Sequence, residues 1–336
     1  MVRFPTNMLN QDAHLSEDVF ADDVRQAPTR DGFGTGVVEA GKANANVVVL
    51  CADLKESTRA EEFEKVFPGR FIEMGVAEQN MATVGSGMAA AGKIPFIASY
   101  AMFNPGRNYE QIRTTVALNR VPVKVCGMHA GVSVGPDGAT HQMLEDIALM
   151  RVIPGMTVIA PGDAEEARKA VIAAASTDGP VYLRFGRAAT PIFTTKETPF
   201  QIGKALMLWS SDAPKIAILS TGSQSHAALA TARALAASGT ESLVLHVPTI
   251  KPLDEAAVLD AAKRAGRVLT VEEHQAAGGF GSAIAEFLGE QHPVPVRRLG
   301  IRDQFGQSGS PEELLRHYKL DALHIQEAAL SLARIY

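Results

Sequence analysis

Short runs of aliphatic and β-branched residues alternate along this chain with longer stretches of helical periodicity. This alternation is typical of parallel sheets whose two faces are covered by helices. The short runs predict strands in two groups, which are Val47–Leu50, Ile94–Ser99, Val123–Met128, Thr157–Ala160 and Val181–Phe185 in the first, and Ile216–Thr221, Leu243–Val247, Val268–Val271 and Val296–Leu299 in the second. The predicted fold class is α/β, with two consecutive three-layer domains built on mostly parallel sheets.

Helical patterns separate these strands. They predict helices at Ala77–Ala91, Tyr109–Asn119, Ala164–Ala175, Ser223–Ala237, Glu255–Ala265 and Ser282–Leu288. Asp163 directly precedes one of them, and its short acidic side chain is suited to cap the helix beginning at Ala164.

A segment with little periodicity, rich in Thr, Lys and Pro, divides the two groups of strands near residues 190–214. We therefore expect an N-terminal arm over residues 1–26 and a first domain over residues 27–193. Residues 194–214 form the linker and the start of the second domain, and residues 215–336 form the rest of it. For the second domain the sequence predicts an α/β scaffold that supports dimer contacts, with His274 as a loop residue.

Composition excludes several classes of function. The net charge is −5 and no dense run of Lys or Arg occurs, so we expect no nucleic-acid partner. The chain has two cysteines, Cys51 and Cys126, which is typical of a reducing compartment. No apolar run resembles a signal peptide or a membrane span, so a cytoplasmic protein with no membrane partner is expected.

The segment Arg70–Ala91 predicts a short strand, a turn at Met74 and Gly75, and a helix with Glu78 in its first turn. Ligands of α/β folds bind at this end of the strands. A single Glu in a first helical turn more often serves only the helix dipole. Glu78 alone is therefore weak evidence for a site.

Two other segments strengthen that evidence, because both follow predicted strands. Tyr100 and Phe103 offer two aromatic rings three residues apart, and the loop His129–Gln142 combines glycines with an Asp and two His. Glycine-rich polar loops at the carboxyl end of a strand commonly bind ligands. Separately, the rings would be interpreted as core aromatics and the histidines as solvated loop residues; together with Glu78 they indicate a site.

The motifs Cys51–Leu54, Gly75–Glu78 and His129–Gln142 resemble those of the pyrimidine-binding and C-terminal domains of transketolase. The last motif contains the core Gly-Pro-Asp-Gly-Ala-Thr-His-Gln, and the resemblance covers nearly the whole chain after residue 27. It implies a thiamine-diphosphate-dependent enzyme that transfers a two-carbon ketol unit from a ketose phosphate to an aldose or aldose phosphate. Deoxyxylulose-phosphate synthase is similar as well, above all in the C-terminal half.

The resemblance implies roles in binding the cofactor. The residue that matches Glu78 hydrogen-bonds a ring nitrogen of the cofactor's aminopyrimidine and favours the imino tautomer, which activates the thiazolium ring. Burial of a carboxyl favours the protonated form that this contact uses. Tyr100 or Phe103 would stack on the flat pyrimidine.

The resemblance also implies roles in binding the sugar. His129 and His141 match histidines on the substrate side, with His141 as a proton donor or acceptor. Asp137 matches a carboxylate that reads the configuration of a donor hydroxyl. The residues that match the family's phosphate contacts are Arg30, Ser57, His129 and Arg187, with Arg184 as an alternative to Arg187.

One expected motif is absent from the sequence. The family holds the cofactor's diphosphate and Mg²⁺ in a separate domain that carries Gly-Asp-Gly, whereas this sequence has Asp-Gly only without the preceding glycine. It has no Asp and Asn cluster of the kind that binds Mg²⁺, so we expect no metal site in this chain. The resemblance therefore implies that this chain is the second subunit of a split transketolase. A partner subunit with the Gly-Asp-Gly domain would hold the diphosphate and Mg²⁺, in an α2β2 heterotetramer.

Three other interpretations stay open on sequence alone. Half of a deoxyxylulose-phosphate synthase would decarboxylate pyruvate. The beta subunit of a 2-oxo-acid dehydrogenase has a similar size and an activating Glu, but that relative normally lacks the Asp-Gly-x-Thr-His-Gln loop. A binding or regulatory protein would have no physical need to combine Glu78, His129, Asp137 and His141.

Overall fold

The first sheet of the computed structural model, which describes residues 8–334, has seven strands in the order β12-β6-β7-β5-β4-β2-β3. All neighbouring strands are parallel except β12 and β6. The strands are β2 (Val47–Cys51), β3 (Phe71–Glu73), β4 (Ile94–Tyr100), β5 (Lys124–Met128), β6 (Thr157–Ile159), β7 (Val181–Arg184) and β12 (Thr249–Lys251). Because β12 comes from the second half of the chain, the two halves share this sheet.

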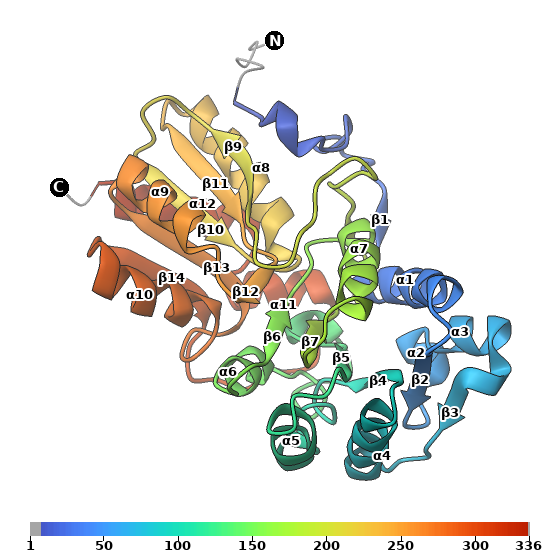
Figure 1. The fold of residues 1–336 in the computed structure, drawn as a ribbon. Coiled ribbons are helices and arrows are strands. Elements are labelled where there is room, and N and C mark those ends of the chain that lie inside the picture. Colours follow the sequence, from blue (N-terminus) through green and yellow to red (C-terminus); the bar gives the residue numbers. More distant parts are fainter. Residues whose placement is uncertain (1–7, 335–336) are drawn as a thin grey trace.

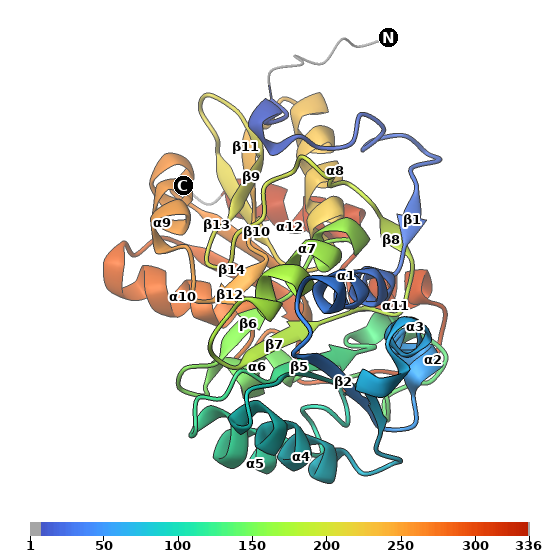
Figure 2. The same cartoon turned by 45° about the vertical axis from the view of Figure 1, so that its right-hand side comes forward.

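Helices cover both faces of the first sheet (Figures 1 and 2). α1 (Thr29–Ala43) and α7 (Ala164–Ala175) pack against each other on one face, and α4 (Glu78–Ala90) and α5 (Tyr109–Gln111) lie on the other. Strand side chains alternate between the faces. The smaller elements of this half are β1 (Gln26–Ala27), α2 (Lys55–Thr58), α3 (Glu61–Val66), α6 (Asp146–Arg151), β8 (Thr190–Pro191) and the single turns at Gln11–Ala13, Pro68–Arg70 and Val132–Val134.

The second sheet has five strands in the order β14-β13-β10-β11-β9, all parallel except β9. Its strands are β9 (Leu206–Ser210), β10 (Ile216–Ser220), β11 (Ser242–His246), β13 (Val268–Gln275) and β14 (Val296–Ile301). Around it lie the helices α8 (Gln224–Ala237), α9 (Glu255–Ala265), α10 (Phe280–Gln291), α11 (Pro311–His317) and α12 (Ala322–Ala333). The chain is thus two α/β domains with mostly parallel sheets, as predicted.

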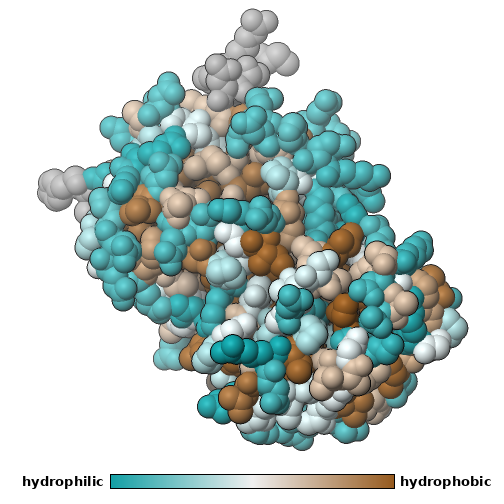
Figure 3. All heavy atoms as spheres, in the orientation of Figure 1, coloured by the Kyte–Doolittle hydropathy of each residue, from teal (hydrophilic) through white to brown (hydrophobic). Residues whose placement is uncertain are grey.

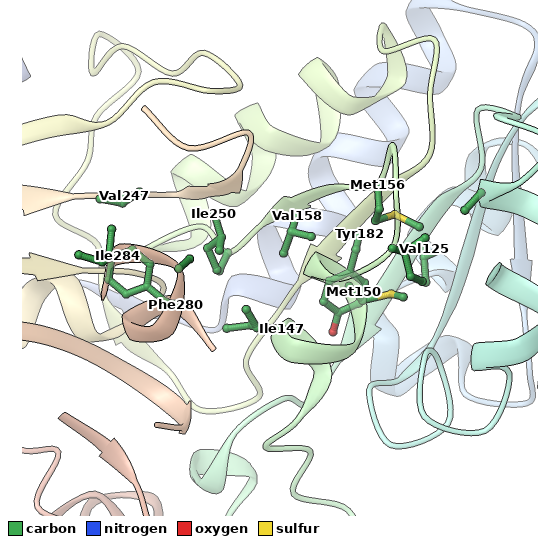
Figure 4. Close-up of a cluster of buried hydrophobic side chains, with 14 of the residues drawn as sticks. Val125, Ile147, Met150, Met156, Val158, Tyr182, Val247, Ile250, Phe280 and Ile284 are labelled. Carbon is green, nitrogen blue, oxygen red and sulfur yellow. The ribbon is translucent and has the colours of Figure 1, made fainter. Parts of the chain in front are cut away.

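One apolar cluster joins the two domains (Figure 4). Ile147, Met150 and Tyr182 of the first domain belong to the same buried cluster as Phe280 and Ile284 of α10. Burial of apolar surface is the main favourable term in such a contact. The two domains are therefore joined by a shared buried core as well as by the linker.

The N-terminal segment from residue 8 runs along the second domain. The backbone of Asn10 donates to the carbonyl of Leu208, Leu9 forms a β-bridge with Trp209, and Val19 is buried in that domain's core. Part of the predicted arm, residues 1–7, lies outside the described residues.

Every predicted strand and helix is present within a few residues, and Asp163 caps α7 by accepting the N–H of Glu166. Two segments differ from the prediction. Ile112–Ala117 is a π-helix rather than part of a regular α-helix. β13 continues to Gln275, so the expectation that His274 is a loop residue was wrong: it is a fully buried strand residue whose Nδ1 donates to the Gln275 carbonyl.

The surface is mixed in character. Hydrophilic and hydrophobic residues are interspersed over the face in Figure 3, where hydrophobic residues form only small groups. None of the helices within residues 8–334 has the length and hydropathy needed to cross a bilayer.

Candidate active site

The predicted site residues gather at the carboxyl end of the first sheet. They come from the loops after β2, β4, β5 and β7 and from the first turns of α1 and α4. The parallel order β7-β5-β4-β2 brings the ends of these strands to one edge. The topology therefore assembles segments that are up to 157 residues apart in the chain, as in the hydrogen bond from the Gly186 N–H to the Thr29 hydroxyl.

Glu78 is the first residue of α4, and its side chain is 2 % exposed. Its Oε2 accepts a hydrogen bond from Arg107 Nη1 at 2.7 Å, while the Asn108 amide donates to its main-chain carbonyl. A buried carboxylate without a partner would be costly, and Arg107 supplies one. Sequence reasoning missed Arg107, which no motif or spacing marks.

Four rings form a continuous cluster at the same edge of the sheet. Tyr100 and Phe103 lie nearly parallel, with ring centroids 6.1 Å apart, and His129 stacks on Tyr100 at 4.1 Å. The His141 ring stands edge-on to both Tyr100 and Phe103. The Arg107 guanidinium lies over the Phe103 ring at 4.5 Å and so connects this cluster to Glu78.

His129 is buried and has a left-handed backbone, with φ of 54°. Arg30 Nη1 lies 2.8 Å from its Nε2 and also donates to the Ser57 carbonyl. Because a guanidinium can only donate, Nε2 is the acceptor and the proton of the neutral ring is on Nδ1. Burial, together with the charges of Arg30 and Arg187, lowers the pKa of His129 to about 3.

The glycine loop presents Asp137 and His141 toward solvent, with Arg187 nearby. Arg187 donates to the Val134 carbonyl and lies 3.6 Å from Asp137. Arg184 points elsewhere: its Nε donates to Asp146 Oδ2, and its side chain is 10 % exposed. Of the two arginines considered for phosphate, Arg187 is the one near the other site residues.

Two buried polar atoms of the site have no hydrogen-bond partner among the described residues, namely Arg30 Nε and His129 Nδ1. Both are donors, and buried donors in folded proteins almost always have acceptors. Their position favours a ligand with acceptor oxygens, such as a phosphate or a sugar hydroxyl. Among residues 8–334, no group of three or more His, Cys, Asp or Glu side chains is arranged to hold a metal ion.

Comparison with known proteins identifies the family. Residues 25–192 match the transketolase pyrimidine-binding domain, and residues 203–325 match the transketolase C-terminal domain. The chain belongs to the transketolase family. Both domains of the resemblance seen in the sequence are thereby confirmed.

Its relatives include split forms of transketolase. A 6-deoxy-6-sulfo-D-fructose transketolase subunit of a Clostridium species is 40 % identical, over 89 % of this chain and 92 % of that one. One of the subunits of an apulose-4-phosphate transketolase of Phocaeicola vulgatus is 36 % identical, over 91 % of this chain and 97 % of that one. A solved split-gene transketolase, described as an inactive beta4 tetramer, has a TM-score of 0.84 and 40 % identity, over 91 % of this chain and 99 % of that one.

Single-chain transketolases are about twice as long. The mouse enzyme is 37 % identical over 90 % of this chain, which spans 49 % of its length. The transketolase family uses thiamine diphosphate, and the site fits the pyrimidine part of that cofactor. A buried carboxylate is connected through Arg107 to stacked aromatic rings, which suit a flat heteroaromatic ring.

Proposed function

We propose that this chain is the second subunit of a split transketolase, which transfers a two-carbon ketol unit between sugars in an assembly with a partner subunit. The observation that carries the proposal is the continuous set of contacts from Glu78 through Arg107, Phe103 and Tyr100 to His129 and Arg30. This set places a buried carboxylate at one end and unpaired donors at the other. A scaffold with no ligand would have no need for either.

Glu78, Tyr100 and Phe103 would hold the cofactor's pyrimidine. Thiamine diphosphate, when bound, supplies a thiazolium carbon that adds to the donor ketone and stabilises the negative charge left by C–C cleavage. Glu78 would share a proton with the pyrimidine ring nitrogen, and the aromatic rings would fix the plane of the ring. For the carboxylate to do so, its contact with Arg107 has to be released or shared, and Arg107 is exposed enough to move without opening the core.

The sugar would lie between the glycine loop and the basic residues. His141 would move a proton at the sugar carbonyl or hydroxyl, and Asp137 would orient a donor hydroxyl. Arg30, Arg187 and neutral His129, with a contribution from Ser57, would bind the phosphate. A guanidinium and an imidazole N–H both donate, so an acceptor-rich phosphate satisfies the two donors that otherwise lack partners.

We infer that the diphosphate and Mg²⁺ are bound by a partner subunit, in an α2β2 heterotetramer. The proposal is supported by the missing Gly-Asp-Gly motif and by the lengths of the relatives, because named subunits match nearly end to end whereas the mouse enzyme is twice as long. The preferred sugars are not set by these relatives, because their names give a sulfofructose and an apulose phosphate.

The experiment is reconstitution with the partner that carries Gly-Asp-Gly, followed by assays with two donors. Ketol transfer from xylulose 5-phosphate to ribose 5-phosphate is expected, and release of CO₂ from pyruvate is not. Consumption of pyruvate with glyceraldehyde 3-phosphate would indicate a deoxyxylulose-phosphate synthase. Oxidative decarboxylation of a 2-oxo acid would indicate a dehydrogenase subunit. Lack of every one of these activities in an assembled, cofactor-loaded complex would contradict an enzymatic role.

A further inference from the structure

The glycine loop that carries His129, Asp137 and His141 is held by the second domain as well as by the first. Its turn Val132–Val134 packs against α11, and two of its glycines, Gly135 and Gly138, face residues 308–309 of the segment between β14 and α11. A Cβ on Gly138 would lie 2.7 Å from Ser308 Oγ. The loop is therefore shaped by contacts that no residue of the first domain provides.

Glu273 makes the most specific of these contacts. It lies in β13 of the second domain, it is 4 % exposed, and its Oε1 accepts the N–H of Ser133 at 2.6 Å. Its Oε2 accepts from the Ser223 hydroxyl at 3.4 Å. A carboxylate that accepts a backbone N–H at this distance makes a strong, charge-assisted hydrogen bond.

Gly131 leaves the space that this carboxylate fills. A Cβ on Gly131 would lie 2.3 Å from Glu273 Oε1, and the residue has φ of +91°, where side chains are disfavoured. Gly131 is two residues from His129, whose own backbone is left-handed. The position of the Glu273 carboxylate thus constrains the backbone conformation of the residues that follow His129.

The first domain fixes Glu273 in turn. Arg184 donates from Nη2 to the main-chain carbonyl of Glu273 at 2.8 Å and from Nε to Asp146. Burial raises the pKa of Glu273, while Arg184 and the hydrogen bond from Ser133 act in the opposite direction. Glu273 is therefore held by hydrogen bonds from both domains.

Gln142 holds the far end of the loop. Its Nε2 donates to the carbonyls of Val132 and Gly135 within the loop and to that of Gln307 in the second domain. The Gln142 side chain is 3 % exposed and also packs against Gly306, where a Cβ would have no room. The loop is thus tied to the second domain at both ends.

We propose that Glu273 is a positioning residue for sugar binding, through which the second domain sets the place of His129, Asp137 and His141. This inference rests on the proposed function, because it assigns these three residues to the sugar. It gives the second domain a part in substrate affinity, beyond supporting the assembly. Glu273 itself touches no substrate; it acts through the Ser133 N–H and Gly131.

The test compares Glu273→Ala and Glu273→Gln with Glu272→Gln, in the full chain reconstituted with its partner. Glu272 is the matched control, since it is the neighbouring buried carboxyl on β13 but accepts the N–H groups of Phe280 and Gly281 at the start of α10. Loss of a charged hydrogen bond predicts that Glu273→Ala raises the KM for xylulose 5-phosphate about 10- to 100-fold. Glu273→Gln keeps an acceptor and should raise it about threefold, and Glu272→Gln should leave it unchanged.

Cofactor affinity separates positioning from general damage. Because Glu78, Tyr100 and Phe103 make no hydrogen bond with Glu273, the Kd of thiamine diphosphate with Mg²⁺ should stay within about threefold of wild type in all variants. A KM that stays at the wild-type value in Glu273→Ala, or that rises equally in Glu272→Gln, would overturn the proposal. If Glu273→Ala does not fold, Gln142→Met removes the other anchor and should raise the same KM about tenfold; an unchanged KM there would also overturn it.

Hydrogen exchange tests the loop without any activity. In the isolated chain, the peptide containing Ser133 should exchange at least tenfold faster in Glu273→Ala than in wild type or Glu272→Gln. If Ser133 exchanges faster in Glu273→Ala but the reconstituted wild-type complex transfers no ketol unit, the anchoring by Glu273 is supported and the proposed function is contradicted. If Ser133 exchanges at the wild-type rate in Glu273→Ala and the wild-type enzyme is active, only the anchoring by Glu273 is contradicted.

Discussion

Two buried acid–arginine pairs in the first domain have the same length and different surroundings. Glu78 and Asp146 are 2 % and 0 % exposed, and each accepts from an arginine at 2.7 Å. Asp146 Oδ2 accepts from the Tyr182 hydroxyl as well, and its partner Arg184 is 10 % exposed. Arg107, the partner of Glu78, is 45 % exposed.

The difference separates a structural pair from one that can open. Water can solvate Arg107 when it leaves Glu78, whereas Arg184 would have to remain inside the protein without its counter-ion. A buried carboxylate whose partner can move into water is suited to receive a ligand. Asp146 instead fixes Tyr182 and Arg184, and through Arg184 the main chain of Glu273.

The largest expected effect is on catalysis by Glu78→Gln. A glutamine has nearly the shape of glutamate but cannot share a proton with the pyrimidine nitrogen, so turnover in the reconstituted enzyme should fall about 10²- to 10⁴-fold. The measurement is kcat at saturating cofactor and donor. Near-normal turnover would show that Glu78 does not activate the cofactor.

Asp146→Ala should instead affect stability. Removing one partner of a fully buried pair leaves Arg184 without its counter-ion, so the free energy of unfolding should fall by about 3–5 kcal/mol. Urea unfolding of the isolated chain measures this change. Glu78→Gln is the comparison and should cost about 1 kcal/mol or less, since its partner is half exposed; equal losses would remove the distinction between the two pairs.

Arg107→Gln should produce a smaller change, in cofactor affinity. If the cofactor and Arg107 compete for the same carboxylate, the variant should bind thiamine diphosphate about fivefold more tightly, as expected for a weak, partly exposed pair. Titration calorimetry on the reconstituted complex measures the Kd, with the exposed Arg113→Gln as control. Weaker binding in Arg107→Gln would mean that Arg107 contacts the cofactor itself.

The last prediction concerns pH, and the contributions of His129 and Glu272 to stability should change with opposite sign. The pKa of His129 in the folded chain is about 3, so below pH 6.5 the unfolded chain takes up a proton that the folded chain does not. The free energy of unfolding therefore decreases by up to about 1.4 kcal/mol for each pH unit that the pH falls. Burial raises the pKa of Glu272 to about 7. The stability that its protonated form contributes is therefore fully present below pH 4.5 and is lost as the pH rises to 7. Urea unfolding between pH 5 and 7 should show a flatter rise of stability with pH for His129→Asn and a steeper one for Glu272→Gln. The same slope as wild type in both variants would contradict these assignments.

Much of the fold could be predicted from the sequence because it depends on local patterns. Buried parallel strands appear as apolar runs such as Val47–Leu50, and α7 has its cap at Asp163. The edge strand β12 could not be predicted, because it pairs with β6 from the other domain. The end of β13 was missed because Glu272, Glu273 and His274 are polar, and only their tertiary hydrogen bonds make burial possible.

In the candidate site, too, the features that depend on local sequence could be predicted and those that depend on tertiary contacts could not. Glu78, the ring pair and the glycine loop are continuous motifs, and the structure brings them to one edge of the sheet. Arg107 and Glu273 carry no sequence signal, because each becomes relevant only through a partner 29 or 140 residues away. Arg184 ends β7 and Arg187 follows three residues later, and only the side-chain directions show which of the two lies near the other site residues.

We propose that this chain contributes a proton-sharing carboxylate and sugar contacts to a cofactor whose diphosphate is bound by another subunit. The most direct measurement is calorimetric titration of thiamine diphosphate with Mg²⁺ into the chain alone, the partner alone and their mixture, with ketol transfer assayed on the same samples. We expect weak, Mg²⁺-independent binding by the chain alone, and tight binding with turnover only in the mixture. Tight Mg²⁺-dependent binding and turnover by the isolated chain would contradict it.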